Sequence, residues 1–182
     1  IENECAICHM PLASHPARGA GGQAGVLSVL PPRPVPDPNA AVFAASVDGV
    51  SCTACHQAED DGLGSAQTMS GRFVVDLASP AGRRKAFGPF AVDAGRARVM
   101  RPATGFVPTE GAHMASAGIC ASCHTLYTHP IGEGVPEGSV LPEQVPYLEW
   151  KASEHAEEQS CQGCHMVEVR GASHIARVMG QD

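Results

Sequence analysis

Aromatic side chains are scarce in this sequence of 182 residues, and their scarcity limits the core that the chain can build. Phe, Tyr and Trp make up only 4% of the residues, whereas 20 glycines and 15 prolines favour turns and loops. A chain with so few large apolar side chains has little to bury against the conformational entropy that folding costs. We therefore expect something other than side chains to fill much of the interior.

Two further absences exclude classes of partner. No stretch of the sequence approaches the roughly 20 apolar residues of a membrane-spanning helix. No long basic run is present and the net charge is -7, which argues against a nucleic acid as the partner. The length predicts a single domain over residues 1–182.

The chain does have eight cysteines, and they fall into four identical motifs of the form Cys-x-x-Cys-His. The first to fourth motifs are residues 5–9, 52–56, 120–124 and 161–165, and their thiols belong to Cys5, Cys8, Cys52, Cys55, Cys120, Cys123, Cys161 and Cys164. This spacing is the attachment signature of c-type haem, because two thiols bind one porphyrin edge and the adjacent imidazole binds the iron. The motifs predict four covalent haems c, with His9, His56, His124 and His165 as the proximal ligands.

Zinc sites and disulfides are the alternative interpretations of paired cysteines. Two four-cysteine zinc sites would leave the four histidines incidental, and a disulfide framework needs no histidine. Histidine occupies 9 of 182 positions. Four of four pairs followed by histidine would then arise by chance with odds on the order of one in 10⁵. The histidines therefore favour haem.

Four haems in this chain correspond to one per about 45 residues, so the porphyrins themselves are expected to form the apolar core. We expect a haem-dominated fold of mostly loops with short α-helices, a minor β-hairpin and little regular secondary structure. Haem attachment of this type takes place outside the cytoplasmic membrane. The protein is therefore expected to be exported to the extracellular space or cell surface, or alternatively to the periplasm.

Five histidines outside the motifs are candidates for the sixth iron ligand: His15, His113, His129, His155 and His174. Four irons need four such ligands, so bis-histidine coordination is possible throughout with one imidazole to spare. Methionine is the alternative axial ligand and would raise the potential. Met69, Met100, Met114 and Met179 remain formal candidates.

Local patterns place four of these histidines. His113 and His155 precede the third and fourth motifs on predicted helices, and Leu148, Ala152, His155 and Ala156 form one helical stripe that we expect to face inward. His15 and His129 each follow a proximal histidine and precede a proline. The alternatives are a core histidine for the first pair and a surface histidine beside a proline turn for the second.

Outside the motifs, residues 40–47 are predicted to form a short helix, and residues 20–38 an extended loop. Residues 72–76 and 89–93 are expected to be short strands joined by a basic turn with Arg83, Arg84 and Lys85. Those cations are expected to be a solvated loop, or else to pair with haem propionates or an acidic partner. Helices are expected to begin near Gly111 and near Pro146.

Beyond the motifs themselves, residues 3–11, 48–56, 113–128, 141–150 and 161–166 resemble a family of exported multihaem cytochromes. The resemblance covers nearly the whole chain. The family is similar to cytochromes with alternating parallel and perpendicular haem pairs. It includes electron carriers, quinol-dehydrogenase partners, nitrite and hydroxylamine enzymes, and tetrahaem subunits that polymerise into extracellular conducting filaments, or nanowires. The resemblance implies bis-histidine ligation and close haem stacking.

Electron transfer is therefore the predicted function. Enzymes need an iron with an open position, and the pentahaem nitrite reductases obtain it with Cys-x-x-Cys-Lys, which this chain lacks. A multihaem nitrogen-compound oxidoreductase is thus the less favoured interpretation. Chiefly by resemblance, we expect a head-to-tail homopolymer, or else a soluble periplasmic carrier that meets redox partner proteins. In the polymer, His15 is predicted to bind a haem of the neighbouring subunit.

Overall fold

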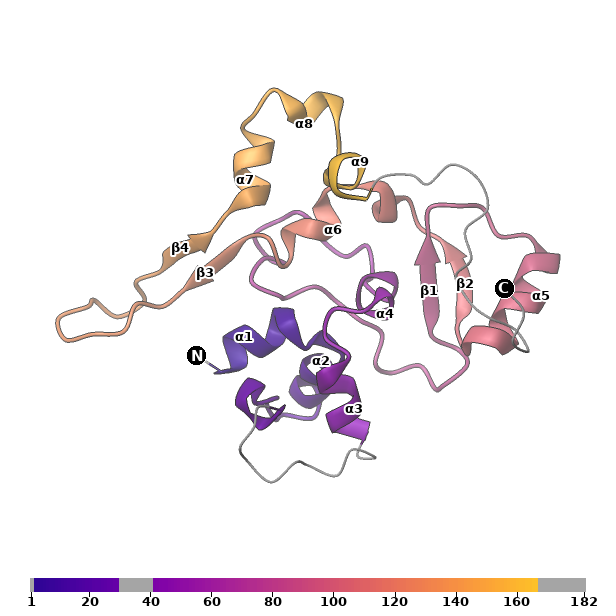
Figure 1. Ribbon diagram of the computed structural model, residues 1–182, viewed down its shortest axis with the longest axis horizontal. Helices are drawn as coiled ribbons and strands as arrows, with labels where there is room; N and C mark the ends of the chain where they lie inside the picture. Colours follow the sequence, from indigo (N-terminus) through magenta and orange to yellow (C-terminus); the bar gives the residue numbers. More distant parts are fainter. Residues whose placement is uncertain (1, 30–40, 167–182) are drawn as a thin grey trace.

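Short helices and long connections make up the chain in its computed structural model, which describes residues 2–29 and 41–166 (Figure 1). The first group of elements comprises α1 (Glu2–His9), α2 (Pro11–Gly19), the 3-10 helix η1 (Val26–Val29) and α3 (Ala41–Val47). They pack around a small buried cluster made of Ala6, Met10, Ala13 and Ala24. Small side chains at three of these four positions let the helices approach closely.

The second group is a parallel strand pair with a helix between its strands. After α4 (Cys52–His56), strand β1 (Lys85–Gly88) pairs with β2 (Val107–Glu110), and α5 (Ala94–Thr104) connects the two. The Asp93 side chain accepts a hydrogen bond from the Arg96 amide at the start of α5. Gly105, with a φ of 76°, ends the helix in the left-handed region that glycine tolerates.

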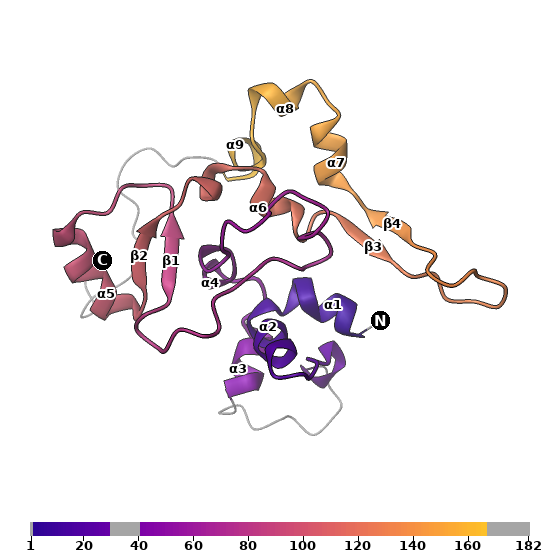
Figure 2. The same cartoon turned by 180° about the vertical axis from the view of Figure 1, so that it is seen from behind.

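The third group carries the last two motifs. It contains η2 (Ala112–Ala115), α6 (Gly118–Ala121), the antiparallel strands β3 (Leu126–Thr128) and β4 (Leu141–Gln144), α7 (Pro146–Lys151), α8 (His155–Glu158) and α9 (Cys161–His165). The β3–β4 hairpin projects at one end of the molecule and α5 lies at the opposite end (Figures 1 and 2). No helix among the described residues has both the length and the apolar character to cross a membrane.

A central segment, residues 68–71, joins the first and third groups. Gly71 N donates to Ser122 O at 2.7 Å, and Ser70 N donates to Thr125 O at 2.9 Å. On one side of this segment, Met69 packs with Ala117, Ala121 and Tyr147 in the second buried cluster. The segment therefore lies against the third motif.

The structure confirms the expected short helices with few, small strands, and it confirms the helix predicted over residues 40–47 as α3. The two strands predicted over residues 72–76 and 89–93 are wrong. Residues 72–76 make only one isolated bridge, between Ala58 and Val75, and Lys85 lies in β1 rather than in a turn. Among the described residues the hairpin is β3–β4. The extended loop predicted over residues 20–38 is wrong at Val26–Val29, which form η1, and its residues from 30 onward lie outside the described part.

Candidate functional site

All four motifs adopt helical turns, and this local structure orients their functional groups. The first, second and fourth motifs lie in α1, α4 and α9, while the third begins in α6 and ends with His124 N donating to Cys120 O at 2.9 Å. In a helix, positions i, i+3 and i+4 share a face. Each motif therefore presents two thiols and one imidazole on the same side. The four imidazoles predicted to be proximal ligands, of His9, His56, His124 and His165, belong to exposed residues.

Thiols from different motifs meet beside the central segment. The Cys8 thiol lies close to that of Cys123, and the Cys120 thiol lies close to that of Cys161. Burial raises the pKa of Cys120 to about 11, and burial also raises the pKa of Cys55. The neighbouring Cys8 thiol, together with burial, raises the pKa of Cys123 as well. The third motif thus contacts both the first and the fourth, and its thiols stay protonated at neutral pH.

A cavity of about 660 Å³ opens between the third and fourth motifs. This volume falls within the roughly 300–1,000 Å³ that is typical of ligand and cofactor sites. The functional groups on its wall are two proximal imidazoles, three motif thiols and one additional histidine: His124, His165, Cys120, Cys161, Cys164 and His155. The cavity therefore brings together groups that lie 45 residues apart in the sequence, from 120 to 165.

An aromatic pair that the sequence analysis did not single out forms another part of this wall. The Tyr147 and Trp150 ring centroids lie 5.6 Å apart, and Trp150 Nε1–H donates to Gln159 O at 2.9 Å. Tyr147 N also donates to His124 O at 3.1 Å. These bonds hold α7 and the turn after α8 around the cavity. Trp150 is the single Trp of the chain and lies between the third and fourth motifs in the sequence. That position is the sequence feature that could have indicated its place beside the site.

His155 reaches this cavity by a different route from the one predicted. The expected continuous helix from Pro146 ends at Lys151, and His155 begins the separate helix α8, where it is exposed rather than on a buried stripe. Ser153 lies at the break, where its Oγ–H donates to Trp150 O at 2.7 Å and its Oγ accepts from His155 N at 3.3 Å. The break turns His155 toward the cavity that both motifs line.

Two histidines use Nδ1 to bond a backbone carbonyl, which is the arrangement common in metal-binding histidines. His56 Nδ1–H donates to Phe87 O, and His129 Nδ1–H donates to Ser139 O at 3.0 Å. In both rings Nε2 then carries the lone pair that can bind iron. His56 is a predicted proximal ligand and His129 a predicted distal one.

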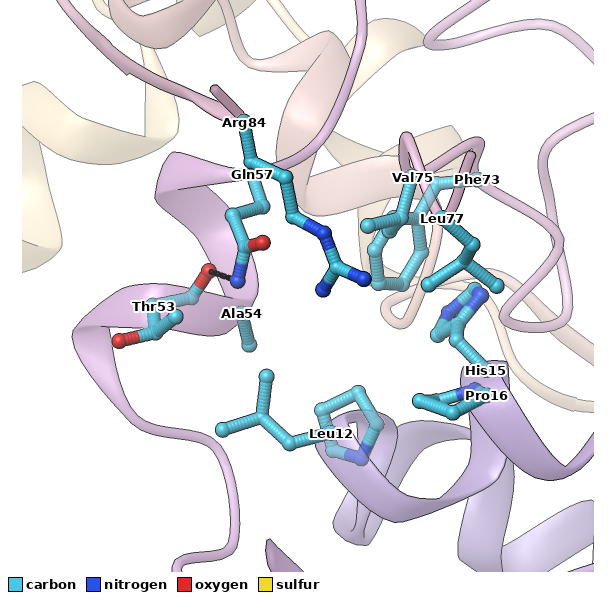
Figure 3. Close-up of a pocket in the computed structure, with 11 residues that line it drawn as sticks. Leu12, His15, Pro16, Thr53, Ala54, Gln57, Phe73, Val75, Leu77 and Arg84 are labelled. Atoms are coloured by element: carbon cyan, nitrogen blue, oxygen red, sulfur yellow. Dashed lines mark hydrogen bonds between the residues drawn. The ribbon is translucent and has the colours of Figure 1, made fainter. Parts of the chain in front are cut away.

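His15 lies in a small cavity of about 60 Å³ between α2 and α4 (Figure 3). Its ring centroid is 4.3 Å from that of Phe73, and its buried Nε2 has no hydrogen-bond partner among the described residues. Burial, with a smaller effect of Arg18, lowers the pKa of His15 to about 4, so the ring is neutral at pH 7. The Arg84 guanidinium points into the same cavity (Figure 3).

The position of His15 differs from the expectation that it reaches a neighbouring subunit. Its ring faces the interior of its own chain, against Phe73, rather than an outer surface. A buried neutral imidazole with an unbonded nitrogen is a costly arrangement unless something binds that nitrogen. His15 is therefore suited to an iron ligand within its own subunit.

His113 is buried and has other partners for its ring. Its Nε2–H donates to Ala58 O at 3.0 Å, and its ring meets the edge of Phe87 at a centroid distance of 4.9 Å. Gly111 leaves room for the ring, because a Cβ at that position would lie 2.9 Å from Nδ1. Binding iron through Nε2 would require the bond with Ala58 to break. The proposal that His113 is a ligand stays a prediction.

The remaining candidates are distributed widely. His174 and Met179 lie outside the described residues, Met69 is buried in the second cluster, and Met100 is exposed on α5. Within the described ranges, no three His, Cys, Asp or Glu side chains are arranged to hold a metal ion directly.

The described residues fit a haem group at the third and fourth motifs. The cavity there has the required donor set, with thiols for covalent attachment and imidazoles for the iron. The unbonded nitrogen of His15 is a second observation that agrees with an absent ligand.

Comparison of the chain with models of known families, with curated proteins and with solved structures finds no match.

Proposed function

We propose that this protein transfers electrons through four covalently bound c-type haems, one at each Cys-x-x-Cys-His motif. The observation that carries the proposal is the cavity of about 660 Å³ that the thiols and proximal histidines of two motifs line together with His155. When bound, each haem supplies an iron that gains or loses one electron. The chain supplies the thiols that anchor the group and the imidazoles that hold the iron.

The protein contributes rigidity and a low-dielectric surrounding to this chemistry. Backbone carbonyls bonded to His56 and His129 fix the orientation of those rings. Tyr147 and Trp150 cover one side of the large cavity with apolar surface. Six-coordinate iron in fixed surroundings exchanges electrons with little rearrangement, which suits transfer between neighbouring sites.

We do not propose an enzyme. Catalysis at iron needs an open coordination position, and five histidines outside the motifs are available for four irons. The carbonyl-bonded ring of His113 gives that residue a structural use, and the other four histidines then match the four irons in number. A nitrogen-compound oxidoreductase is the second candidate only if one iron proves to be five-coordinate.

The site of action follows from the proposed cofactor. Covalent haem attachment outside the cytoplasmic membrane places the protein at the cell surface, in the extracellular space or in the periplasm. We propose that it is a subunit of an extracellular cytochrome filament, with a diffusible periplasmic carrier as the alternative. We also propose that the haems fill much of the interior, because the chain has few large apolar side chains of its own.

Intact mass and electron paramagnetic resonance test the proposal. Mass spectrometry of the purified protein should show four haems added to the 18.8 kDa chain, retained in denaturant. The oxidised protein should give only low-spin ferric signals. An unmodified mass, or a mass with zinc ions, would reject the haem assignment. A stoichiometric high-spin signal would shift the proposal to the enzyme.

Two variants sharpen this experiment. His15→Ala should convert one iron in four to high spin, because it removes the unbonded Nε2 that we assign to iron. His113→Gln should leave all four irons low spin, because an amide can still donate to Ala58 O. A high-spin signal from His113→Gln alone would identify His113 as a ligand and His15 as the spare residue.

A further inference from the structure

Half of the cations of this acidic chain gather at one end of the molecule. Residues 83–104, which we call the cationic end, contain six of the twelve Lys and Arg residues and one carboxylate, Asp93. These cations are Arg83, Arg84, Lys85, Arg96, Arg98 and Arg101. Arg84 turns inward to the His15 cavity (Figure 3), and the other five are exposed. The outer surface there is strongly positive although the chain has a net charge of -7.

Among the described residues, few carboxylates pair with the cationic end. Lys85 pairs with Glu59 at 3.8 Å and Arg96 with Asp93 at 3.4 Å, but Arg98 and Arg101 form no ion pair with any described residue. None of the residues of α5 is buried. Phe90 and Val99 are 77% and 71% exposed, so apolar surface lies among the cations. Apolar surface rimmed by charge is typical of protein-binding sites.

The opposite charge gathers on a different part of the molecule. Residues 131–158, which we call the acidic arm, contain seven glutamates and a single cation, Lys151. The glutamates are Glu133, Glu137, Glu143, Glu149, Glu154, Glu157 and Glu158, all exposed and none in an ion pair with a described residue. Leu141 and Ile131 add exposed apolar surface, at 55% and 78%.

These two regions cannot neutralise each other within one chain. In both views of the molecule, α5 lies at one end of the long axis and the β3–β4 hairpin at the other, with α7 and α8 near the hairpin (Figures 1 and 2). At physiological ionic strength, charges are screened beyond about 8 Å. Complementary charge of this kind strongly favours contact between two molecules over contact within one.

We propose that the cationic end of one copy of this protein docks on the acidic arm of the next copy. Two different surfaces meet in this contact, so each copy keeps its other surface free, and the pair has one surface of each kind for further neighbours. Contacts of this heterologous type extend into a chain unless their rotation closes a ring. This inference deepens the filament part of the proposed function, because it names the surfaces that join the subunits.

The location of the contact agrees with transfer between subunits. Glu154, Glu157 and Glu158 belong to the arm, and they flank His155, which lines the large cavity. A partner bound to the arm therefore covers α8 beside the third and fourth motifs. An unrelated acidic or basic protein would bind only one of the two surfaces. Association between copies of this chain uses the cationic end of one copy and the acidic arm of the other.

Sedimentation velocity of the haem-loaded full chain tests the proposal with two charge-reversed variants. In low salt the parent should self-associate, and about 0.5 M salt should weaken the association at least tenfold. Arg98→Glu/Arg101→Glu lowers the charge of the cationic end from +5 to +1, and Glu157→Lys/Glu158→Lys changes the charge of the acidic arm from -6 to -2. Each variant alone should associate at least tenfold more weakly than the parent. A mixture of the two should recover association into one-to-one pairs, because the unchanged cationic end of the second variant meets the unchanged acidic arm of the first.

Controls separate docking from net charge and from folding. Arg98→Gln/Arg101→Gln and Ala44→Glu/Ala66→Glu lower the net charge by the same amount, but only the first changes the cationic end, so only the first should weaken association. His15→Ala should associate like the parent, since its ring lies inside its own chain. A parent that stays monomeric, or a mixture that fails to recover, would overturn the proposal. Four intact low-spin haems in the parent and in the charge variants would leave the electron-transfer proposal standing.

Discussion

Gly71 is the single residue on which the contact between the first and third motifs depends most directly. Its φ is 72°, a conformation that side-chain-bearing residues rarely adopt. A Cβ at this position would lie 1.9 Å from Ile7 Cγ2 and 3.4 Å from Cys8 Sγ. The absence of a side chain therefore lets residues 68–71 pass between α1 and the third motif.

Replacing Gly71 with alanine should destabilise the protein substantially. The left-handed conformation costs about 1–2 kcal/mol, and overpacking against Ile7 adds about 1–3 kcal/mol. Denaturant unfolding of the haem-loaded protein measures the sum. Gly82→Ala is the matched control, because Gly82 has a φ of 79° but no atom within 4 Å of the added Cβ. An equal loss of unfolding free energy in the two variants would show that the added Cβ does not clash with Ile7.

At this scale the sequence predicts the attachment residues but not their surroundings. The predicted attachment residues follow from the motif spacing alone, which can be read directly from eight cysteines and four histidines. The partners of the other histidines are set by the tertiary fold. His113 bonds Ala58, 55 residues away, and His15 packs on Phe73. No local sequence pattern around either histidine indicates which distant residue it contacts.

Secondary structure elements were predicted where their signals are local. The helix α3 contains three alanines, the best helix formers, among its seven residues, and Pro146 correctly marks the start of α7. The strand predicted over residues 72–76 has the alternation of a strand, with Phe73 buried and Val74 exposed, but only one bridge to a partner. Alternation reports which side chains are buried, and a strand also needs a neighbouring backbone to bond.

The parallel pair β1–β2 shows why partners are hard to predict. Lys85 pairs with Val107, and the whole helix α5 lies between them in sequence. Asp93 was interpreted as the end of a strand, although an aspartate is also a common helix N-cap. In the structure Asp93 is the N-cap of α5, so the sequence did contain the signal for the start of this helix.

Removing the cap should loosen the first turn of α5. Asp93→Ala leaves the Arg96 amide without its acceptor, so that amide should exchange with solvent faster, whereas Asp93→Asn should preserve the cap. The hydrogen bond from Arg96 N lowers the pKa of Asp93 below its ordinary 3.8. The capping contribution is therefore fully present above pH 3.8 and is lost as pH falls through the lowered pKa. Fast exchange in the asparagine variant as well would show that the backbone does not use this cap.

Across the whole molecule, the third motif occupies the junction between the other groups of elements. Its Cys123 thiol meets Cys8 of the first motif, and its Cys120 thiol meets Cys161 of the fourth. The central segment bonds its backbone at Ser122 and Thr125. The fourth motif, in contrast, belongs to α9 near the arm, where partly buried Cys161 packs against the second buried cluster and Gln162 Nε2 donates to Ser116 O at 2.8 Å. Loss of these two motifs should therefore have unequal effects.

Paired cysteine replacements distinguish a junction from a peripheral site. Cys120→Ala/Cys123→Ala should remove one haem and the contacts that connect α1 to the third motif, so amide exchange in α1 and α2 should accelerate. Cys161→Ala/Cys164→Ala should also remove one haem, yet α1 and α2 should keep their protection, because their own cluster of Ala6, Met10, Ala13 and Ala24 is untouched. Mass spectrometry counts three haems in each variant, and hydrogen exchange of the same samples locates the loss. Equal acceleration in α1 for both variants would mean that haem number, rather than the position of the third motif, holds the molecule together.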